Sequence, residues 1–324
     1  MRGFLSKTLH SKMWKRRNKL FIYICKNILK GMAIIETHQL TKYYGRVRGI
    51  ENVNLSIDEG EIFGFIGPNG AGKSTAIRTL LNLIFPTSGS ASIFGLDIVK
   101  DSKEIKKNIG YLPSESNYYD NMTVLELMQY SADFYGHKLE QYFYHLSERF
   151  ELDLKRQLQD LSMGNKKKVS IVQSMLHQPR LIIMDEPTNG LDPLMQSRFF
   201  EVIREQNKKG VTIFFSSHIL SDVQRLCKRV AVIRDGQIIT IEEVEQLRKK
   251  LLKRCFVILD SAPDQQDFII PGMENVKTVQ ENTLSFNFSG NINELTRHLS
   301  GYDIKDMVIE ESDLEEIFMH YYEK

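Results

Sequence analysis

Apolar and polar residues alternate in two segments near the start of the chain, residues 33–40 and 50–57. This period of two predicts half-buried strands, and the turn residues Tyr43-Tyr44-Gly45 between them favour an antiparallel pair. The run Leu181–Met184 is apolar without a break, which is typical of a strand buried on both faces. Further short strands are predicted at residues 61–66, 91–94, 108–111, 211–215, 230–233 and 237–241, the last two as a hairpin across Asp235-Gly236.

Apolar residues recur at helical spacing between these strands, at residues 76–84, 193–208 and 219–227. A charged helix is expected near residues 100–107, and residues 123–178 have an almost wholly helical pattern without proline. Strands that alternate with helices along a chain predict a parallel sheet flanked by helices, so the fold class is α/β.

The pattern changes after residue 241. A charged helix is predicted there, followed by a mixture of short strands and helices that predicts a small α+β appendage. The segments are a helix at 241–253, strands at 255–259, 276–279 and 284–288, helices at 291–299 and 312–321, and a loop at 261–267. We therefore predict three parts, namely an extension over residues 1–31, a large domain over 32–248 and the appendage over 249–324.

Composition excludes several classes of protein. With 42% hydrophobic and 26% charged residues, the 324-residue chain is ordinary for a globular protein with a core. Its three cysteines, Cys25, Cys227 and Cys255, are scattered, so neither a disulfide framework nor a zinc site is indicated. Residues 1–31 hold nine Lys/Arg and no acid, which leaves 34 basic against 41 acidic residues, or −7, for the remainder. We therefore expect no nucleic-acid partner.

The basic N-terminal extension allows three interpretations. It could be an amphipathic surface-binding segment or a leader, although no small-residue cleavage site follows its apolar run. The interpretation favoured here is a disordered tail outside the fold, because Met32 opens the first clean strand pattern. Its longest apolar run, Leu20–Cys25, is far shorter than the roughly 20 residues needed to cross a bilayer.

One glycine-rich segment lies between a predicted strand and a predicted helix. It matches the pattern G-x-x-x-x-G-K-[ST], whose backbone N–H groups bind phosphates at a helix N-terminus. Glycines permit this because a side chain would hold the backbone away from the phosphates. Lys73 supplies a cation for the β- and γ-phosphates and Ser74 a hydroxyl for Mg²⁺. The nucleotide-binding residues are Gly67, Pro68, Asn69, Gly70, Ala71, Gly72, Lys73, Ser74 and Thr75.

Two carboxylates follow the buried strand at 181–184. Ligands of open α/β sheets bind at the carboxyl ends of the strands, so both side chains are expected to face the phosphates. Asp185 is suited to bind Mg²⁺ through water, and Glu186 to accept a proton from the attacking water.

Four motifs together resemble the ATP-binding cassette (ABC) family of transporter ATPases. In chain order they are GPNGAGKST, LSMGN, LIIMDEPTNGLDP and SSH, within residues 33–245. The tail at 310–318 is similar to the appendage of bacterial ABC exporters whose ATPase and permease are separate chains. The resemblance implies a parallel-sheet core, an antiparallel β subdomain and a helical signature subdomain.

The resemblance also implies roles for single residues. Tyr44 is implied to stack on adenine, although its neighbour Tyr43 could take that role. His218 is implied to contact the γ-phosphate and to orient the attacking water. Ser162 and Gly164 of the signature face the γ-phosphate held by another protomer, and Asp192 crosses the interface between protomers.

The sequence departs from the family pattern at three positions. Met163 and Asn165 replace Gly and Gln of the usual L-S-G-G-Q, and Ser114 stands where the family has Gln. A Ser hydroxyl is too short to contact both Mg²⁺ and the permease, so Mg²⁺ binding is expected to depend on Ser74, Asp185 and water. The run at 166–168, three lysines, is expected to be a solvated face.

By this resemblance the chain is an ATP-hydrolysing subunit that uses ATP and Mg²⁺ and drives a separate transmembrane permease, as an exporter. It would act as a homodimer, or as a heterodimer with a similar subunit, peripheral to the cytoplasmic face of the membrane. The alternative is a soluble ABC ATPase that acts on the ribosome or on DNA without a permease.

Overall fold

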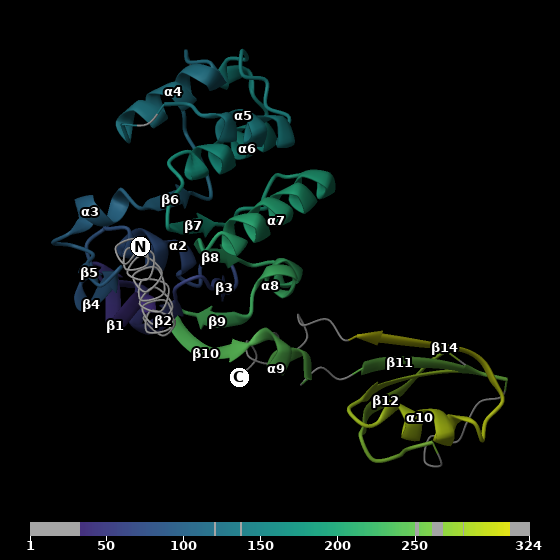
Figure 1. Cartoon of the computed structure of the whole chain (residues 1–324). Helices are drawn as coiled ribbons and strands as arrows, with labels where there is room; N and C mark the ends of the chain where they lie inside the picture. Colours follow the sequence, from purple (N-terminus) through teal and green to yellow (C-terminus); the bar gives the residue numbers. More distant parts are fainter. Residues whose placement is uncertain are drawn as a thin grey trace, which may run out of the picture. The chain divides into compact units, whose positions relative to one another are not determined.

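A computed structural model describes residues 33–119, 121–136, 138–249, 253–260, 268–280 and 282–311. They form two compact units, which divide between Ile241 and Glu242 (Figure 1). The predicted extension at 1–31, the loop at 261–267 and the helix at 312–321 lie outside the described residues.

The first sheet is antiparallel. β1 (Ala33–Tyr44) pairs with β2 (Val47–Asp58) on one side and with β4 (Ser88–Ile93) on the other, and the short β5 (Leu96–Asp97) forms an edge. The predicted antiparallel pair is confirmed, and its strands continue further toward the turn at Gly45 than the alternation indicated. This brings Tyr44 to the very end of β1.

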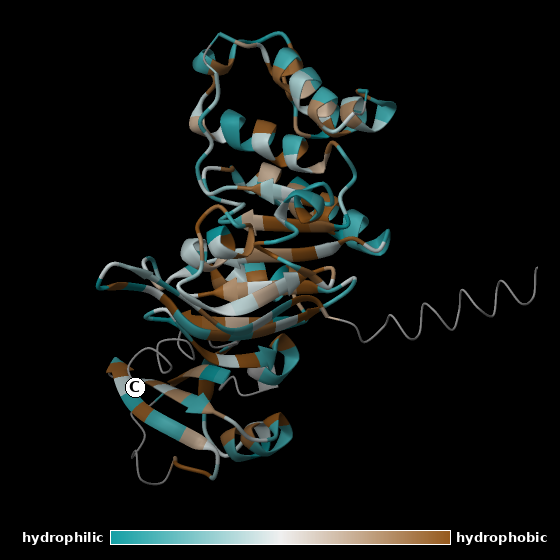
Figure 2. Ribbon diagram, turned by 90° about the vertical axis from the view of Figure 1, so that its left-hand side faces the viewer, coloured by the Kyte–Doolittle hydropathy of each residue, from teal (hydrophilic) through white to brown (hydrophobic). Residues whose placement is uncertain are grey.

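The second sheet has six strands in the order β10-β9-β3-β8-β7-β6. The pairs β9–β3, β3–β8, β8–β7 and β7–β6 are parallel, as the alternation of strands and helices predicted. Every residue of β3, β7 and β8 is buried, and Figure 2 shows hydrophobic residues concentrated in these central strands. The bounds are β3 (Ile62–Ile66), β6 (Ile109–Leu112), β7 (Leu181–Asp185), β8 (Thr212–Ser217), β9 (Arg229–Arg234) and β10 (Gln237–Glu243).

Helix α2 (Lys73–Leu80) packs between the two sheets. Its buried Ala76, Ile77 and Leu80 share one apolar core with residues of both sheets, such as Val53 and Ile183. Helices α7 (Pro193–Lys208) and α8 (Leu220–Leu226) pack on β8, and the short α3 (Ser102–Lys106) packs on β6. The first residue of α2 is therefore held where β3 ends.

Residues 123–178 were predicted as almost wholly helical, but their described part forms a layer of three separate α-helices, so that prediction was wrong in its continuity. The helices are α4 (Val124–Phe134), α5 (Gln141–Arg149) and α6 (Met163–Met175). Gly136 and Glu151 adopt positive φ angles of 72° and 53°, which end α4 and α5. A pattern of apolar spacing does not record such breaks, because the apolar residues on both sides belong to one core.

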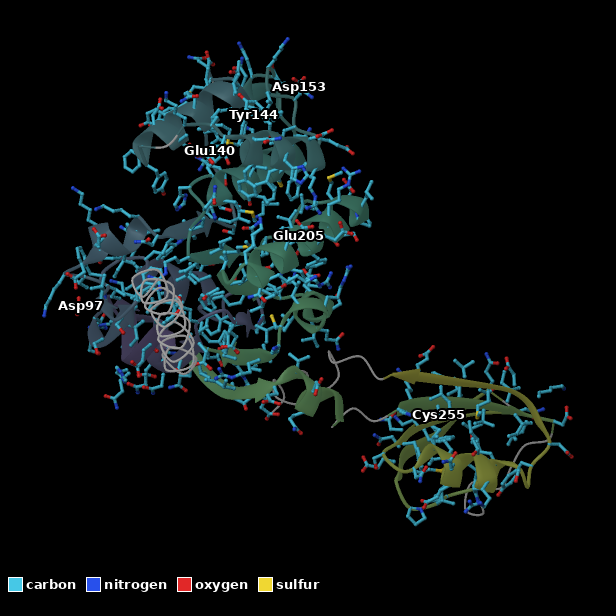
Figure 3. All side chains as sticks on the ribbon, in the orientation of Figure 1. Asp97, Glu140, Tyr144, Asp153, Glu205 and Cys255 are labelled. Atoms are coloured by element: carbon cyan, nitrogen blue, oxygen red, sulfur yellow. The ribbon has the colours of Figure 1, made fainter. Side chains whose placement is uncertain are left out.

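The layer of three helices is fastened to the sheet-bound helix α7. Arg149 of α5 donates hydrogen bonds to Glu205, labelled in Figure 3, at 2.6 Å and to Glu201 at 3.3 Å. Arg198 of α7 pairs with Glu151 at 2.6 Å. These ion pairs fix the start of the loop that leads to α6.

In the second unit, the described residues form an antiparallel sheet of four strands in the order β12-β13-β11-β14, and helix α10 (Ile292–Leu299) packs on it. Its core includes Cys255, labelled in Figure 3, together with Phe268 and Phe286. The predicted α+β character of the appendage is confirmed for these residues. The strands are β11 (Lys253–Leu259), β12 (Met273–Gln280), β13 (Thr283–Phe288) and β14 (Ile304–Glu311).

Two predictions for this part of the chain were wrong. The helix expected at 241–253 is only α9 (Val244–Lys249), because β10 continues to Glu243 and β11 already begins at Lys253. Strand β14 was not predicted. A register shift between Asp306 and Ile304 breaks the alternation of its apolar residues, so its pattern has no period of two.

None of the helices in the described part of the chain is long and apolar enough to cross a membrane.

Candidate nucleotide-binding site

The glycine-rich loop connects the end of β3 to the start of α2. Gly72 has φ of 104°, and a Cβ there would lie 2.5 Å from the carbonyl oxygen of Gly49. A Cβ on Gly67 would lie 2.3 Å from the carbonyl oxygen of Ile233. Side chains are therefore excluded at both positions. The first turn of α2 contains no acidic residue, so nothing opposes an anion at this helix N-terminus.

The ammonium group of Lys73 is buried inside the loop. It donates hydrogen bonds to the carbonyl oxygens of Gly67 at 2.6 Å and Pro68 at 3.1 Å. It also forms an ion pair with Oε1 of Glu186 at 3.2 Å. The first and the third of the predicted motifs thus meet, through opposite charges, at the carboxyl end of the parallel sheet.

Asp185 ends β7 and is fully buried. One carboxylate oxygen, Oδ1, accepts a hydrogen bond from the hydroxyl of Ser216 at 2.6 Å, whereas Oδ2 is buried without a hydrogen-bond partner. A buried, unpartnered carboxylate oxygen is costly unless a cation or a water satisfies it. Ser74 lies in the first turn of α2. Its hydroxyl and the carboxylate of Asp185 are oxygen ligands of the type that Mg²⁺ prefers, so these two residues fit the ion.

Glu186 follows β7 in the left-handed region, with φ of 49°. Its Oε2 lies 2.8 Å from Nδ1 of His218, and its backbone N–H donates to the carbonyl oxygen of Ser216 at 3.2 Å. The structure therefore places the predicted base Glu186 between Lys73 and His218. Its strained backbone is held by the neighbouring strand β8.

A second buried pair supports this arrangement. The hydroxyl of Thr188 donates to Oδ2 of Asp222 at 2.6 Å, which joins the loop after Glu186 to helix α8 after His218. Burial raises the pKa of Asp222, and the hydrogen bond from Thr188 opposes that shift. Sequence reasoning missed Thr188, Asp222 and Ser216. Two of them stood within quoted motifs, Thr188 in LIIMDEPTNGLDP and Ser216 in SSH, whereas Asp222 carried no signal.

Tyr44 and Tyr43 differ in their surroundings. Tyr44 is 47% exposed and has the ammonium of Lys42 over its ring at 5.4 Å. Tyr43 donates its hydroxyl to Glu51 at 2.7 Å. A Cβ on Gly49 would lie 3.0 Å from the ring of Tyr44 and 2.8 Å from the methyl group of Thr75, so this glycine lets the Tyr44 ring approach the start of α2.

The signature segment and the loop that ends at Asp192 lie against each other. Ser162 caps α6 by accepting from the N–H of Asn165 at 3.3 Å, and Asp192 caps α7 by accepting from the N–H of Met195 at 3.0 Å. A Cβ on Gly164 would lie 2.6 Å from the carbonyl oxygen of Gly190. Within the described residues, no hydrogen bond or ion pair joins Ser162, Gly164 or Asp192 to the glycine-rich loop.

The expectation of a solvated lysine face was wrong for one of its three residues. Lys167 is only 6% exposed, and its ammonium donates to the carbonyl oxygens of Pro113 at 3.1 Å and Ser114 at 3.0 Å. Burial lowers the pKa of Lys167 to about 8, although the carboxylates of Asp185, Glu186 and Glu115 oppose the shift. A run of three lysines did not indicate which of them points inward.

Comparison with known proteins shows what this chain is similar to. A family model described as "ABC transporter" matches residues 50–189. The bacitracin transport ATP-binding protein BcrA of Bacillus licheniformis is 32% identical over 89% of this chain and 96% of its own length. The linearmycin resistance ATP-binding protein LnrL of Bacillus subtilis is 28% identical over 89% of this chain and 97% of its own.

A solved structure described as the ATP binding subunit of an ABC transporter is 32% identical. It superposes with a TM-score of 0.62 over 67% of this chain and 92% of that one. The dimeric ABC cassette MJ0796, bound to ADP and Pi, is 24% identical with a TM-score of 0.59, a likeness that concerns the fold alone.

Proposed function

This chain belongs to the ABC transporter family of ATP-binding proteins, and from that premise we propose that it hydrolyses ATP to drive a separate membrane permease that exports its substrate. The names of its relatives, which refer to bacitracin transport and linearmycin resistance, support transport. No observation favours the alternative of an ATPase that acts on the ribosome or on DNA.

The observation that carries this proposal is the line of contacts from Lys73 through Glu186 to His218, at 3.2 Å and 2.8 Å. Glu186 accepts the proton of the attacking water, and His218 orients its carboxylate and contacts the γ-phosphate. Ser74 and Asp185 would hold Mg²⁺, which supplies positive charge against the developing negative charge of the phosphates. Tyr44 offers its exposed ring to adenine.

Binding of ATP changes the partners of Lys73. The triphosphate competes with Glu186 for the ammonium group, because both are anions within its reach. When the phosphates take the lysine, the carboxylate of Glu186 loses its ion pair and becomes available to a water molecule. The same lysine thereby keeps the base occupied until the substrate is bound.

The pocket of one chain is incomplete in this proposal. Ser162, Gly164 and Asp192 have no bond to the glycine-rich loop of their own chain within the described residues, and Met163 beside them is 82% exposed. A second protomer, identical or similar, would present the N-terminus of its α6 to the γ-phosphate. ATP closes the two protomers, hydrolysis reopens them, and a permease at the cytoplasmic face of the membrane follows this movement.

The variant Glu186→Gln tests the proposal. We expect it to slow ATP turnover at least 100-fold, to accumulate as dimers with Mg-ATP, and to bind ATP roughly 3- to 30-fold more tightly, since the competing charge on Lys73 is removed. Turnover, sedimentation and equilibrium binding measure these effects. Glu104→Gln, an exposed residue of α3, is the matched control. Undiminished hydrolysis by Glu186→Gln contradicts the assignment of the base.

A further inference from the structure

Residues 113–119, called the strap below, follow β6 of the parallel sheet and precede α4 of the helical layer in the chain. Two residues of α6 hold the strap, and their spacing of three places them on one face of that helix. Lys167 donates to the carbonyl oxygens of Pro113 and Ser114. The hydroxyl of Ser170 lies 2.6 Å from that of Ser116 and is also hydrogen bonded to the hydroxyl of Tyr118.

The strap leaves the sheet beside the catalytic carboxylates. β6 and β7 are parallel neighbours, and Leu112, the last residue of β6, is paired with Met184, which precedes Asp185. At its other end, α6 begins at the signature, with Ser162 as its cap. The contacts of Lys167 therefore join the edge of the sheet that carries Asp185 to the helix that carries the signature.

A lysine is an expensive choice for this position. Its charged group is buried, and burial alone favours loss of its proton, whereas the carbonyl oxygens and the nearby carboxylates of Asp185, Glu186 and Glu115 stabilise the charged form. An apolar residue would fill the same volume at a lower cost if packing were the only requirement. A hydrogen-bond donor is needed here because the carbonyl oxygens of Pro113 and Ser114 both accept from this side chain.

We propose that Lys167 is a positioning residue that clasps the strap to α6, so that the signature and the carboxylate edge of the sheet keep the spacing needed for hydrolysis. The inference rests on the proposed ATPase function. It assigns to Lys167 no contact with ATP. Loss of the clasp should therefore lower kcat and leave binding of ATP to the glycine-rich loop nearly unchanged.

The experiment compares Lys167→Met, which removes the donor, with Lys167→Gln, which keeps a donor without the charge, in the full chain. Lys168→Met is the control, because the neighbouring Lys168 is only partly buried. We expect Lys167→Met to lower kcat about tenfold or more, to change KM for ATP less than threefold, and to speed amide hydrogen exchange in the strap at least tenfold. Lys167→Gln should restore most of kcat and of the protection, and Lys168→Met should resemble the unaltered chain.

Several results would overturn the inference. One is that Lys167→Met changes neither kcat nor the rate of amide hydrogen exchange in the strap, or only one of the two. Another is that Lys167→Gln fails to restore kcat or fails to restore the protection of the strap. If Lys167→Met does not fold, Ser170→Ala takes its place. We then expect faster amide hydrogen exchange at residues 116–118, and unchanged exchange there would contradict the inference. A lack of ATP hydrolysis by the unaltered chain would instead contradict the proposed function, and the exchange measurement would still decide whether Lys167 holds the strap.

Discussion

Buried charges at the carboxyl end of the parallel sheet determine what single residues can do there. Lys73, Glu186 and Asp185 are each less than 10% exposed. Each is held by a hydrogen bond or an ion pair from a different element, namely the glycine-rich loop, α2 and β8. Interactions between charges are strong in such a water-poor place, so small changes in geometry have large effects.

Gly164 is a position where one methyl group should matter. In Gly164→Ala the new Cβ would meet the carbonyl oxygen of Gly190 at 2.6 Å, so the loop ending at Asp192 must shift. We expect the free energy of unfolding to fall by about 1–3 kcal/mol and ATP turnover to fall about tenfold or more. Gly301→Ala is the control, because its Cβ would make an ordinary contact of 3.5 Å. Equal effects of the two variants in urea titrations would refute this explanation.

Lys167 predicts a dependence of stability on pH in the nucleotide-free protein. Burial lowers its pKa from the ordinary 10.5 to about 8 in the folded chain, so between these two pH values the unfolded chain binds more protons. The free energy of unfolding should therefore rise with pH across this interval, by about 2 kcal/mol between pH 7.5 and pH 10. Urea titrations of Lys167→Met should lack this contribution, whereas Lys168→Met should keep it. Parallel pH profiles for Lys167→Met and the unaltered chain would contradict the prediction.

Hydrogen bonds between residues that are near in sequence determine where a helix begins. Helix α4 begins with a capping box, in which the hydroxyl of Thr123 accepts from the N–H of Glu126 at 3.2 Å and the carboxylate of Glu126 accepts from the N–H of Thr123 at 2.8 Å. Thr123 lies four residues beyond the last residue of the strap, and its cap fixes where the helical layer begins.

Thr123→Ala removes one half of that capping box. We expect a loss of about 1 kcal/mol in the free energy of unfolding, because the N–H of Glu126 loses its acceptor. Thr123→Ser keeps the hydroxyl and serves as the control, with a change of less than about 0.5 kcal/mol. Urea unfolding followed by circular dichroism measures both. A loss of similar size in Thr123→Ser would show that the methyl group, and not the cap, is what matters.

The described residues form two units with separate cores. The apolar residues of the first unit and those of the second form distinct clusters, each built from its own sheets. We keep the prediction that residues 32–248 are the nucleotide-binding domain, that 249–324 are an appendage, and that 1–31 are not needed for activity.

A chain of residues 32–248 tests these boundaries. We expect it to bind ATP within about threefold of the full chain, since every predicted nucleotide contact lies inside it and a separate core needs no help to fold. A chain that ends at Gly236 lacks β10 and the hydrogen bond from Gln237 to Glu51 at 2.8 Å, and it should unfold at a lower temperature. Loss of ATP binding by residues 32–248 would refute the boundaries. Binding isotherms and thermal unfolding provide the measurements.

Local chemistry was sufficient for much of the sequence-based prediction. The glycine-rich loop, the two carboxylates at the end of β7 and the burial of that strand were all predicted, because backbone geometry and burial restrict which residue types can stand there. The family resemblance added His218, Ser162 and Asp192, for which spacing alone offered little. The bounds of α7 agreed to the residue, since Asp192 and Pro193 mark a helix start in any context.

The sequence by itself thus determined the fold class, the phosphate-binding loop and the order of the motifs, since these depend on neighbours along the chain. Only the tertiary structure decided that Lys73 pairs with Glu186, that Gly164 faces Gly190 and that Lys167 points inward. Each of these contacts joins residues that are far apart in sequence. Their energies depend on burial and on distances between elements, which no local pattern of residues records.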